Sequence, residues 1–154
     1  TERELSKGAK RVCKALKAIH KVGYLHGDVG LRAYSSTETK AKVNLSRPWK
    51  ILEVLDIRGQ AEQLPVSETD ISRLLYLSPE TIESDERGTT PASEVWSLGI
   101  TLYVLATGRY PFINMQQICE APLLWPNKIP FSTQFKSMVS QMLEKDQNLR
   151  PSVK

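Results

Sequence analysis

One segment in the second half of the chain governs its architecture: residues 91–108 read PASEVWSLGITLYVLATG. Nine of the twelve residues from Val95 to Ala106 are apolar, and at helical spacing they cover every side of a helix instead of one stripe. A helix that is apolar all round is typical of the centre of a globular domain. Gly108 marks its expected end. We expect four of its large side chains to be buried: Trp96, Leu98, Leu102 and Leu105.

The overall composition fits one ordinary globular domain. The chain has 154 residues, of which 40% are hydrophobic and 25% charged, which excludes a disordered or fibrous protein. Its longest apolar run, Val95 to Ala106, is too short to span a membrane. The start of the chain, at Thr1, shows no signal-peptide pattern. It also lacks an initiator Met, so we expect a fragment of a longer protein.

Cysteine usage bears on the compartment. Cys13 and Cys119 are too few for a disulfide framework, and neither has a second Cys or a His at metal-ligand spacing. We therefore expect no structural zinc. Reduced thiols favour an intracellular location, either cytoplasmic or nuclear.

Positive charge is concentrated at the start of the chain. Residues 1–21 contain seven basic and two acidic side chains, a net charge of +5, whereas residues 22–154 contain 14 basic and 15 acidic ones, a net charge of −1. Apolar spacings of four and three predict a helix with an apolar face of Leu5, Ala9, Val12, Leu16 and Ile19. Another face carries a stripe of Lys7, Lys10, Lys14, Lys17 and Lys21. This stripe is either a solvated face, which we favour because no aromatic residues interleave, or a surface for nucleic acid or anionic lipid.

Other segments give weaker predictions. Residues 22–30 contain three glycines and are typical of a loop. The polar residues 35–48 indicate a long hairpin loop or an insertion, and Trp49–Leu55 is aliphatic enough for a strand. Residues 135–143 place apolar side chains at helical spacing.

Five short motifs follow one another along the chain. They are His26-Gly27-Asp28, Ser78-Pro79-Glu80, Glu94-Val95-Trp96-Ser97-Leu98-Gly99, Gly108-Arg109-Tyr110-Pro111-Phe112, and Met142-Leu143-Glu144-Lys145-Asp146 with Arg150-Pro151. In this order and at these intervals they resemble the C-terminal lobe of a eukaryotic-type protein kinase. The resemblance covers nearly all of residues 1–154 and implies a mainly α fold, a helical bundle around a central buried helix with a short β-hairpin.

By this resemblance residues 3–22 form the long helix before the catalytic loop and residues 91–107 form the central helix. Residues from about 54 to 80 correspond to the activation segment. Nothing in the chain resembles the small β-rich N-terminal lobe with its glycine-rich loop. Half of an ATP cleft is therefore missing from this chain.

The resemblance also implies structural roles. Glu80 ends the activation segment and pairs with Arg150, because burying one of these charges without the other is strongly unfavourable. Trp96 belongs to the core of the central helix. Glu94 stands where the family has an aspartate that accepts backbone N–H bonds from the catalytic loop, and its extra methylene implies a carboxylate that is less well fixed.

The catalytic loop is degraded. The family pattern is His-Arg-Asp-Leu-Lys-Pro-x-Asn, and the corresponding residues here read HGDVGLRA. His26 and Asp28 match, so Asp28 is a vestigial candidate for the catalytic base, or an acid that only holds the loop through backbone N–H bonds. Gly30 replaces the lysine that screens the transferred phosphate, and Ala33 replaces the asparagine that binds magnesium. Gly27 replaces the arginine that docks a phosphorylated activation loop.

The metal-binding Asp-Phe-Gly motif has no counterpart after the predicted strand. One register places Val54-Leu55-Asp56 there and resembles Tribbles-like pseudokinases, and we prefer it. The other register makes Glu53 the acid that reaches a cation. Glu53 and Asp56 are thus weak candidates for cofactor binding, and we expect neither ATP nor Mg²⁺ to bind because several preorganised charges are gone.

These observations leave three functions open. The first, which we favour over an enzyme, is a pseudokinase-type lobe that acts as a protein-binding, scaffolding or regulatory module in signalling. The alternative is the C-terminal lobe of a divergent, active Ser/Thr kinase that uses Asp28 and obtains its N-terminal lobe from outside this chain. The second alternative is a basic helix that binds nucleic acid or anionic membrane.

Overall fold

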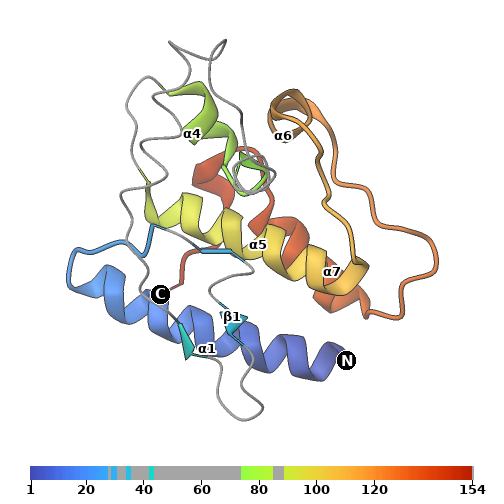
Figure 1. The fold of residues 1–154 in the computed structure, drawn as a ribbon, viewed down its shortest axis with the longest axis horizontal. Helices are drawn as coiled ribbons and strands as arrows, with labels where there is room; N and C mark the ends of the chain where they lie inside the picture. Colours follow the sequence, from blue (N-terminus) through green and yellow to red (C-terminus); the bar gives the residue numbers. More distant parts are fainter. Residues whose placement is uncertain (28, 31–33, 36–41, 44–73, 85–88, 154) are drawn as a thin grey trace.

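The computed structural model describes residues 1–27, 29–30, 34–35, 42–43, 74–84 and 89–153. This part is mainly helical, which confirms the predicted fold class (Figure 1). The long helices are α1 (Glu2–Lys21), α5 (Pro91–Thr107) and α7 (Thr133–Met142). The short elements are α4 (Pro79–Glu83), α6 (Met115–Glu120), the 3-10 helix η3 (Gln147–Leu149) and the strands β1 (Tyr34–Ser35) and β2 (Lys42–Val43).

Helix α5 is the centre of the molecule. Figure 1 shows it crossing the middle of the fold with α1 running below it in the opposite direction, and α5 packs against both α1 and α7. The helix starts with a capping box between Thr90 and Ser93 and ends at Gly108, whose φ of 73° suits a residue without a Cβ. The predicted bounds of this helix are confirmed.

Burial along α5 matches the prediction except at one residue. Trp96, Leu98 and Leu102 are buried, but Leu105 is 43% exposed, so the expectation that it is buried was wrong. The reason is its place in the helix: none of residues 104–107, the last turn, is fully buried.

Helix α1 lies against α5 through its apolar face. Ala9, Val12 and Leu16 are buried in the core, whereas Leu5 and Ile19 near the helix ends are half-buried. Thr1 and Glu4 form a capping box at the start. The helix matches the predicted range to within one residue, because its apolar spacing reflects a real buried face.

A glycine lets α5 meet the end of α7 at close range. A Cβ added to Gly99 would lie 2.9 Å from Cδ2 of Leu143 and 2.9 Å from Cβ of Met142. Phe135 and Val139 continue this buried face of α7, as the helical spacing of residues 135–143 predicts.

The short elements show what periodicity finds and misses. Strands β1 and β2 pair antiparallel, with Tyr34 opposite Val43, so the expected hairpin is present. Pro79 occupies the first turn of α4, where a missing N–H costs nothing. Helix α6 was not predicted, because six residues are too few to show a period. The predicted strand Trp49–Leu55 lies outside the described residues.

Two further observations concern the chain as a whole. Cys13 and Cys119 are free thiols, both partly buried, and burial raises the pKa of each. Among the described helices, none combines the length and the apolar character that crossing a membrane requires.

We predict that Leu102→Ala lowers the free energy of unfolding by about 2–5 kcal/mol. Leu102 is only 1% exposed, so removing most of its side chain leaves a cavity in the core. Leu105→Ala removes the same atoms from the exposed last turn of α5 and should cost about 1 kcal/mol or less. Urea unfolding of both variants measures the difference. Equal losses would show that α5 is not buried along its middle.

We also predict opposite effects at two helical glycines. Gly99→Ala should destabilise the protein by about 1–3 kcal/mol, because the new methyl group overlaps Met142 and Leu143. Gly8→Ala should stabilise it by about 0.5–1 kcal/mol, because nothing lies within 4 Å of the added Cβ and alanine favours a helix. Thermal unfolding of the two variants gives the sign. A stabilising Gly99→Ala would contradict the close packing of α5 on α7.

Candidate functional site

The loop that follows α1 returns to the first turns of α5. Gly23 and Gly27 have φ values of 78° and 76°, the left-handed region that favours glycine. His26 and Gly27 are buried, and the Gly27 N–H donates to Oε1 of Glu94 at 2.6 Å. Glycine therefore suits the backbone conformation at position 27. It does not supply the charged side chain of the arginine that the family pattern has there.

The carboxylate of Glu94 is held on both oxygens. It is 1% exposed, and its Oε2 lies 2.6 Å from Nε2 of His20 in α1, which donates when the ring carries a proton there. The expectation that this longer side chain is less well fixed was wrong, because His20 and Gly27 take one oxygen each. Glu94 thus joins α1, the loop and α5.

His20 was not singled out by the sequence analysis. It follows the buried Leu16 by four residues, where the apolar face of α1 would continue. A polar residue at such a position indicates a buried polar partner, and this is the signal that the sequence offered.

Four of the predicted active-site residues lie outside the described residues: Asp28, Ala33, Glu53 and Asp56. The described neighbours of Asp28 are the buried Gly27 and Val29. A Cβ added to Gly30 would lie 3.8 Å from the ring of Tyr76. The position where the family has a phosphate-screening lysine therefore faces an aromatic ring. In the described ranges no three His, Cys, Asp or Glu side chains are grouped closely enough to hold a metal ion.

Glu80 and Arg150 form a two-pronged ion pair. Nη1 and Nη2 of Arg150 donate to Oε1 and Oε2 of Glu80, each at 2.6 Å. The Arg150 side chain is wholly buried, and its remaining N–H groups donate to the backbone oxygens of Ala92, Glu144 and Lys145. Every charge-bearing group of the guanidinium thus has a partner, which is the condition for burying it.

The ring of Trp96 lies beside two cations. The guanidinium carbon of Arg150 is 5.0 Å and Nζ of Lys145 is 5.1 Å from the ring centre. Lys145 also lies 3.7 Å from the ring centre of Phe112, and it donates to the oxygens of Gln117 and Ile118 in α6. Burial lowers the pKa of Lys145 to about 8. These contacts fasten α6 and the chain after α7 to α5.

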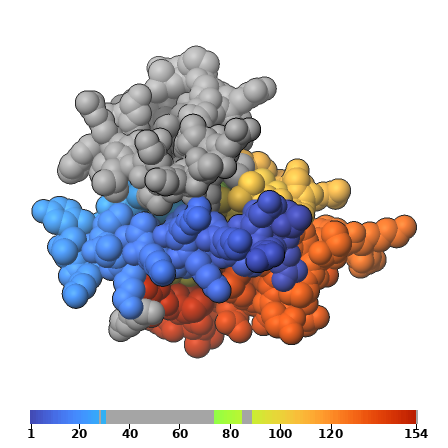
Figure 2. Space-filling view, turned by 90° about the horizontal axis from the view of Figure 1, so that it is seen from below, coloured from blue at the N-terminus to red at the C-terminus, as the bar shows by residue number. Residues whose placement is uncertain are grey.

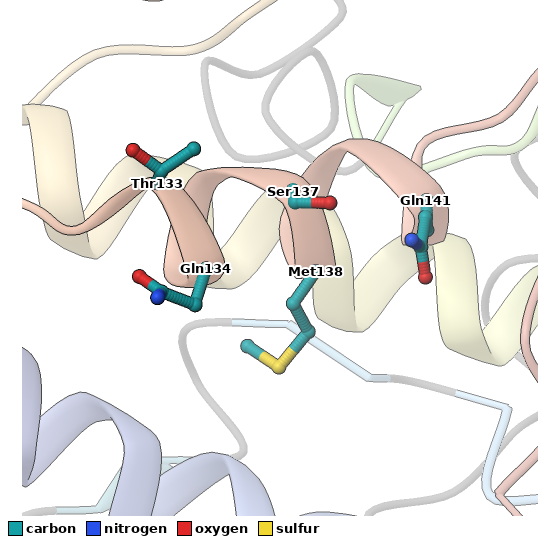
Figure 3. Close-up of a pocket in the computed structure, with 5 residues that line it drawn as sticks. All are labelled: Thr133, Gln134, Ser137, Met138 and Gln141. Atoms are coloured by element: carbon teal, nitrogen blue, oxygen red, sulfur yellow. The ribbon is translucent and has the colours of Figure 1, made fainter.

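One hollow opens on the outer face of α7 (Figure 3). Its lining side chains are Thr133, Gln134, Ser137, Met138 and Gln141. None of them is titratable at neutral pH, and all come from one helix. The hollow therefore offers no groups for acid–base or metal chemistry.

The comparisons with known proteins agree on one family. A family model described as "Protein kinase domain" matches residues 1–154. The chain is 31% identical over 143 residues to mitogen-activated protein kinase kinase 3 of Arabidopsis thaliana, covering 88% of this chain and 27% of that protein. It is 38% identical over 88 residues to human dual specificity mitogen-activated protein kinase kinase 7, covering 49% of this chain and 21% of that protein. It is 28% identical over 156 residues to the serine/threonine-protein kinase ppk11 of Schizosaccharomyces pombe, covering 95% of this chain and 46% of that protein. The chain thus spans less than half the length of each of these relatives.

We predict that Glu94→Ala lowers the free energy of unfolding by about 3–5 kcal/mol, because it leaves the Gly27 N–H and the His20 ring without their buried acceptor. Amide exchange at Gly27 should become faster in the same variant. Glu120→Ala, which removes an exposed carboxylate, should stay within about 0.5 kcal/mol of the unaltered protein.

A double-mutant cycle with His20→Ala separates the two bonds. It should give a coupling of about 0.5–3 kcal/mol between His20 and Glu94. Unchanged Gly27 exchange in Glu94→Ala would show that the carboxylate does not hold the loop.

Proposed function

Because this chain belongs to the protein kinase domain family, we propose that it is a degenerate C-terminal lobe that binds or scaffolds a protein partner in signalling and does not transfer phosphate. One contrast carries the proposal. The contacts that support the lobe are complete, namely Glu94 on the loop and Arg150 on Glu80. The positions that would touch phosphate have lost their charge.

Phosphoryl transfer depends on charged groups placed where negative charge develops. Gly30 supplies none at the position of the phosphate-screening lysine, and the Tyr76 ring beside it offers a largely apolar surface instead. Ala33 supplies no metal ligand. Gly30 in the described part and Ala33 as read from the sequence are therefore poorly suited to Mg-ATP, and the loss of each preorganised donor typically costs about 10²–10³ in rate.

The choice between the two metal registers does not alter the proposal. If Asp56 or Glu53 approaches the site, it supplies one carboxylate, while the amide ligand is still missing at Ala33. One remaining acid cannot hold Mg²⁺ against phosphate in the way that the paired ligands of the family do. We expect no cofactor, and an intracellular compartment fits the two free thiols.

A second candidate function is phosphoryl transfer by Asp28 in a longer protein. Two observations favour it: Asp28 keeps the position of the base, and the relatives named above are described as kinases. It requires an N-terminal lobe that this chain does not contain, and an unusual metal site. The test below distinguishes it from the scaffolding function.

We predict that millimolar Mg-ATP leaves the melting temperature of this chain unchanged. The same result is expected for any longer protein of which this chain is a part. A ligand that binds the folded state raises stability by mass action, by about 2.7 kcal/mol at a hundred times its Kd. Mg²⁺ alone and ATP with a chelator serve as controls. A rise that requires both Mg²⁺ and ATP would contradict the proposal.

The second arm replaces the candidate base. In cells that express a longer protein containing this chain, Asp28→Asn should leave the signalling output of that protein unchanged. Arg150→Ala should abolish this output because it disrupts the fold. Loss of output in Asp28→Asn, together with loss of phosphate transfer in vitro, would establish the kinase function instead.

A further inference from the structure

Helix α1 carries a straight row of positive charge. Arg3 and the five lysines of the predicted stripe recur every three or four residues, which places all six within about 80° of the helix circumference. From Arg3 to Lys21 the row is about 27 Å long at 1.5 Å per residue. The buried residues Ala9, Val12 and Leu16 lie on the opposite side. We call these six side chains the basic row.

The basic row is exposed and makes no ion pair or hydrogen bond within the described ranges. All six side chains are exposed to solvent. Figure 2 shows α1 lying lengthwise across one face of the molecule. Glu2 accepts from the N–H and hydroxyl of Ser132, and Glu4 accepts from Thr1. The hydrogen bond from the Thr1 amino group is the main cause of the lowered pKa of Glu4, and the charge of Lys7 is a minor cause.

The chemistry of the row favours a flat, diffuse anionic surface. Five of its six members are lysines, which are hydrated point charges without the planar fork of arginine. No aromatic side chain stands within the row to stack on a base, and its residues run in a straight line. At its end Val22 and Tyr24 are 67% and 71% exposed, and a tyrosine with one apolar and one polar end suits a lipid interface.

We propose that the basic row is a docking surface for an anionic lipid bilayer, with Val22 and Tyr24 at its end meeting the headgroup region. The charge distribution orients the chain on such a surface. Residues 1–21 carry +5 and residues 22–154 carry −1, so the α1 face is attracted while the remainder is not. This inference is independent of whether the chain binds nucleotide.

The test is cosedimentation of the chain with vesicles of phosphatidylcholine alone and with vesicles containing about 30% phosphatidylserine. Binding should occur only with phosphatidylserine and should weaken as salt rises. A triple variant removes the middle of the row: Lys10→Gln, Lys14→Gln and Lys17→Gln. Each lysine near an anionic surface contributes about fivefold in affinity, so this variant should bind about 100-fold more weakly.

A matched control removes the same net charge elsewhere: Arg109→Gln, Lys128→Gln and Lys136→Gln. It should bind vesicles nearly as well as the unaltered chain.

Tyr24→Ser should weaken binding by a few fold without changing its salt dependence. The melting temperature of the triple variant should be unchanged because its altered side chains are exposed. If it falls, the pair Lys7→Gln and Lys21→Gln repeats the test, with a loss of about 25-fold.

Three results would overturn the proposal. They are equal binding to neutral vesicles, equal losses in the triple variant and its control, and tighter binding to duplex DNA or RNA than to vesicles at equal phosphate concentration. The last result would make the row a nucleic-acid surface.

Discussion

The carboxylate of Glu94 is almost completely removed from solvent, and a charge in that position requires hydrogen-bond donors from the protein. Two neighbouring segments, both far from Glu94 in the sequence, supply them: the His20 ring near the end of α1 and the Gly27 N–H in the following loop. This requirement fixes the end of α1, the start of the loop and the first turns of α5 relative to one another. A hydrophobic contact would tolerate small shifts, whereas a buried carboxylate constrains both distance and direction.

The same end of α5 receives a second polar network. Arg150 reaches the backbone oxygen of Ala92 while it binds Glu80, so α4 and the end of the described chain also meet α5 there. Trp96, one turn further on, lies beside the guanidinium. The apolar body of α5 sets where the core is, and the two networks set how the loops around it are arranged. In this chain these contacts are present although Gly30 has no charge to offer a phosphate and Ala33 has no side-chain ligand to offer a metal ion.

The sequence predicted best where one physical cause dominates a long segment. The apolar spacing of three and four residues in α1 and the continuous apolar character of α5 both arise from burial. Both helices were therefore predicted with nearly correct bounds. Leu105 was misjudged because periodicity tells which side of a helix is apolar and not how far along it the neighbouring elements extend. His20 was missed because its partner lies 74 residues away, and the pairing of Glu80 with Arg150 came from resemblance to a family and not from any local pattern. Asp28 lies outside the described residues, and so do residues 54–73, which the resemblance assigns to the activation segment.

The polar contacts that fasten this lobe join positions far apart along the chain. Gly27 and Glu94 are 67 residues apart, Glu80 and Arg150 are 70 apart, and Glu2 and Ser132 are 130 apart. Closing loops of this size costs entropy, and each bond needs its partners already in place, so we expect these bonds to form after the helices have collapsed onto α5. Interactions that are absent from the folding transition state do little to speed folding and act mainly by slowing unfolding. We therefore expect the long-range contacts around α5 to act mainly on how long the folded lobe persists once it has formed.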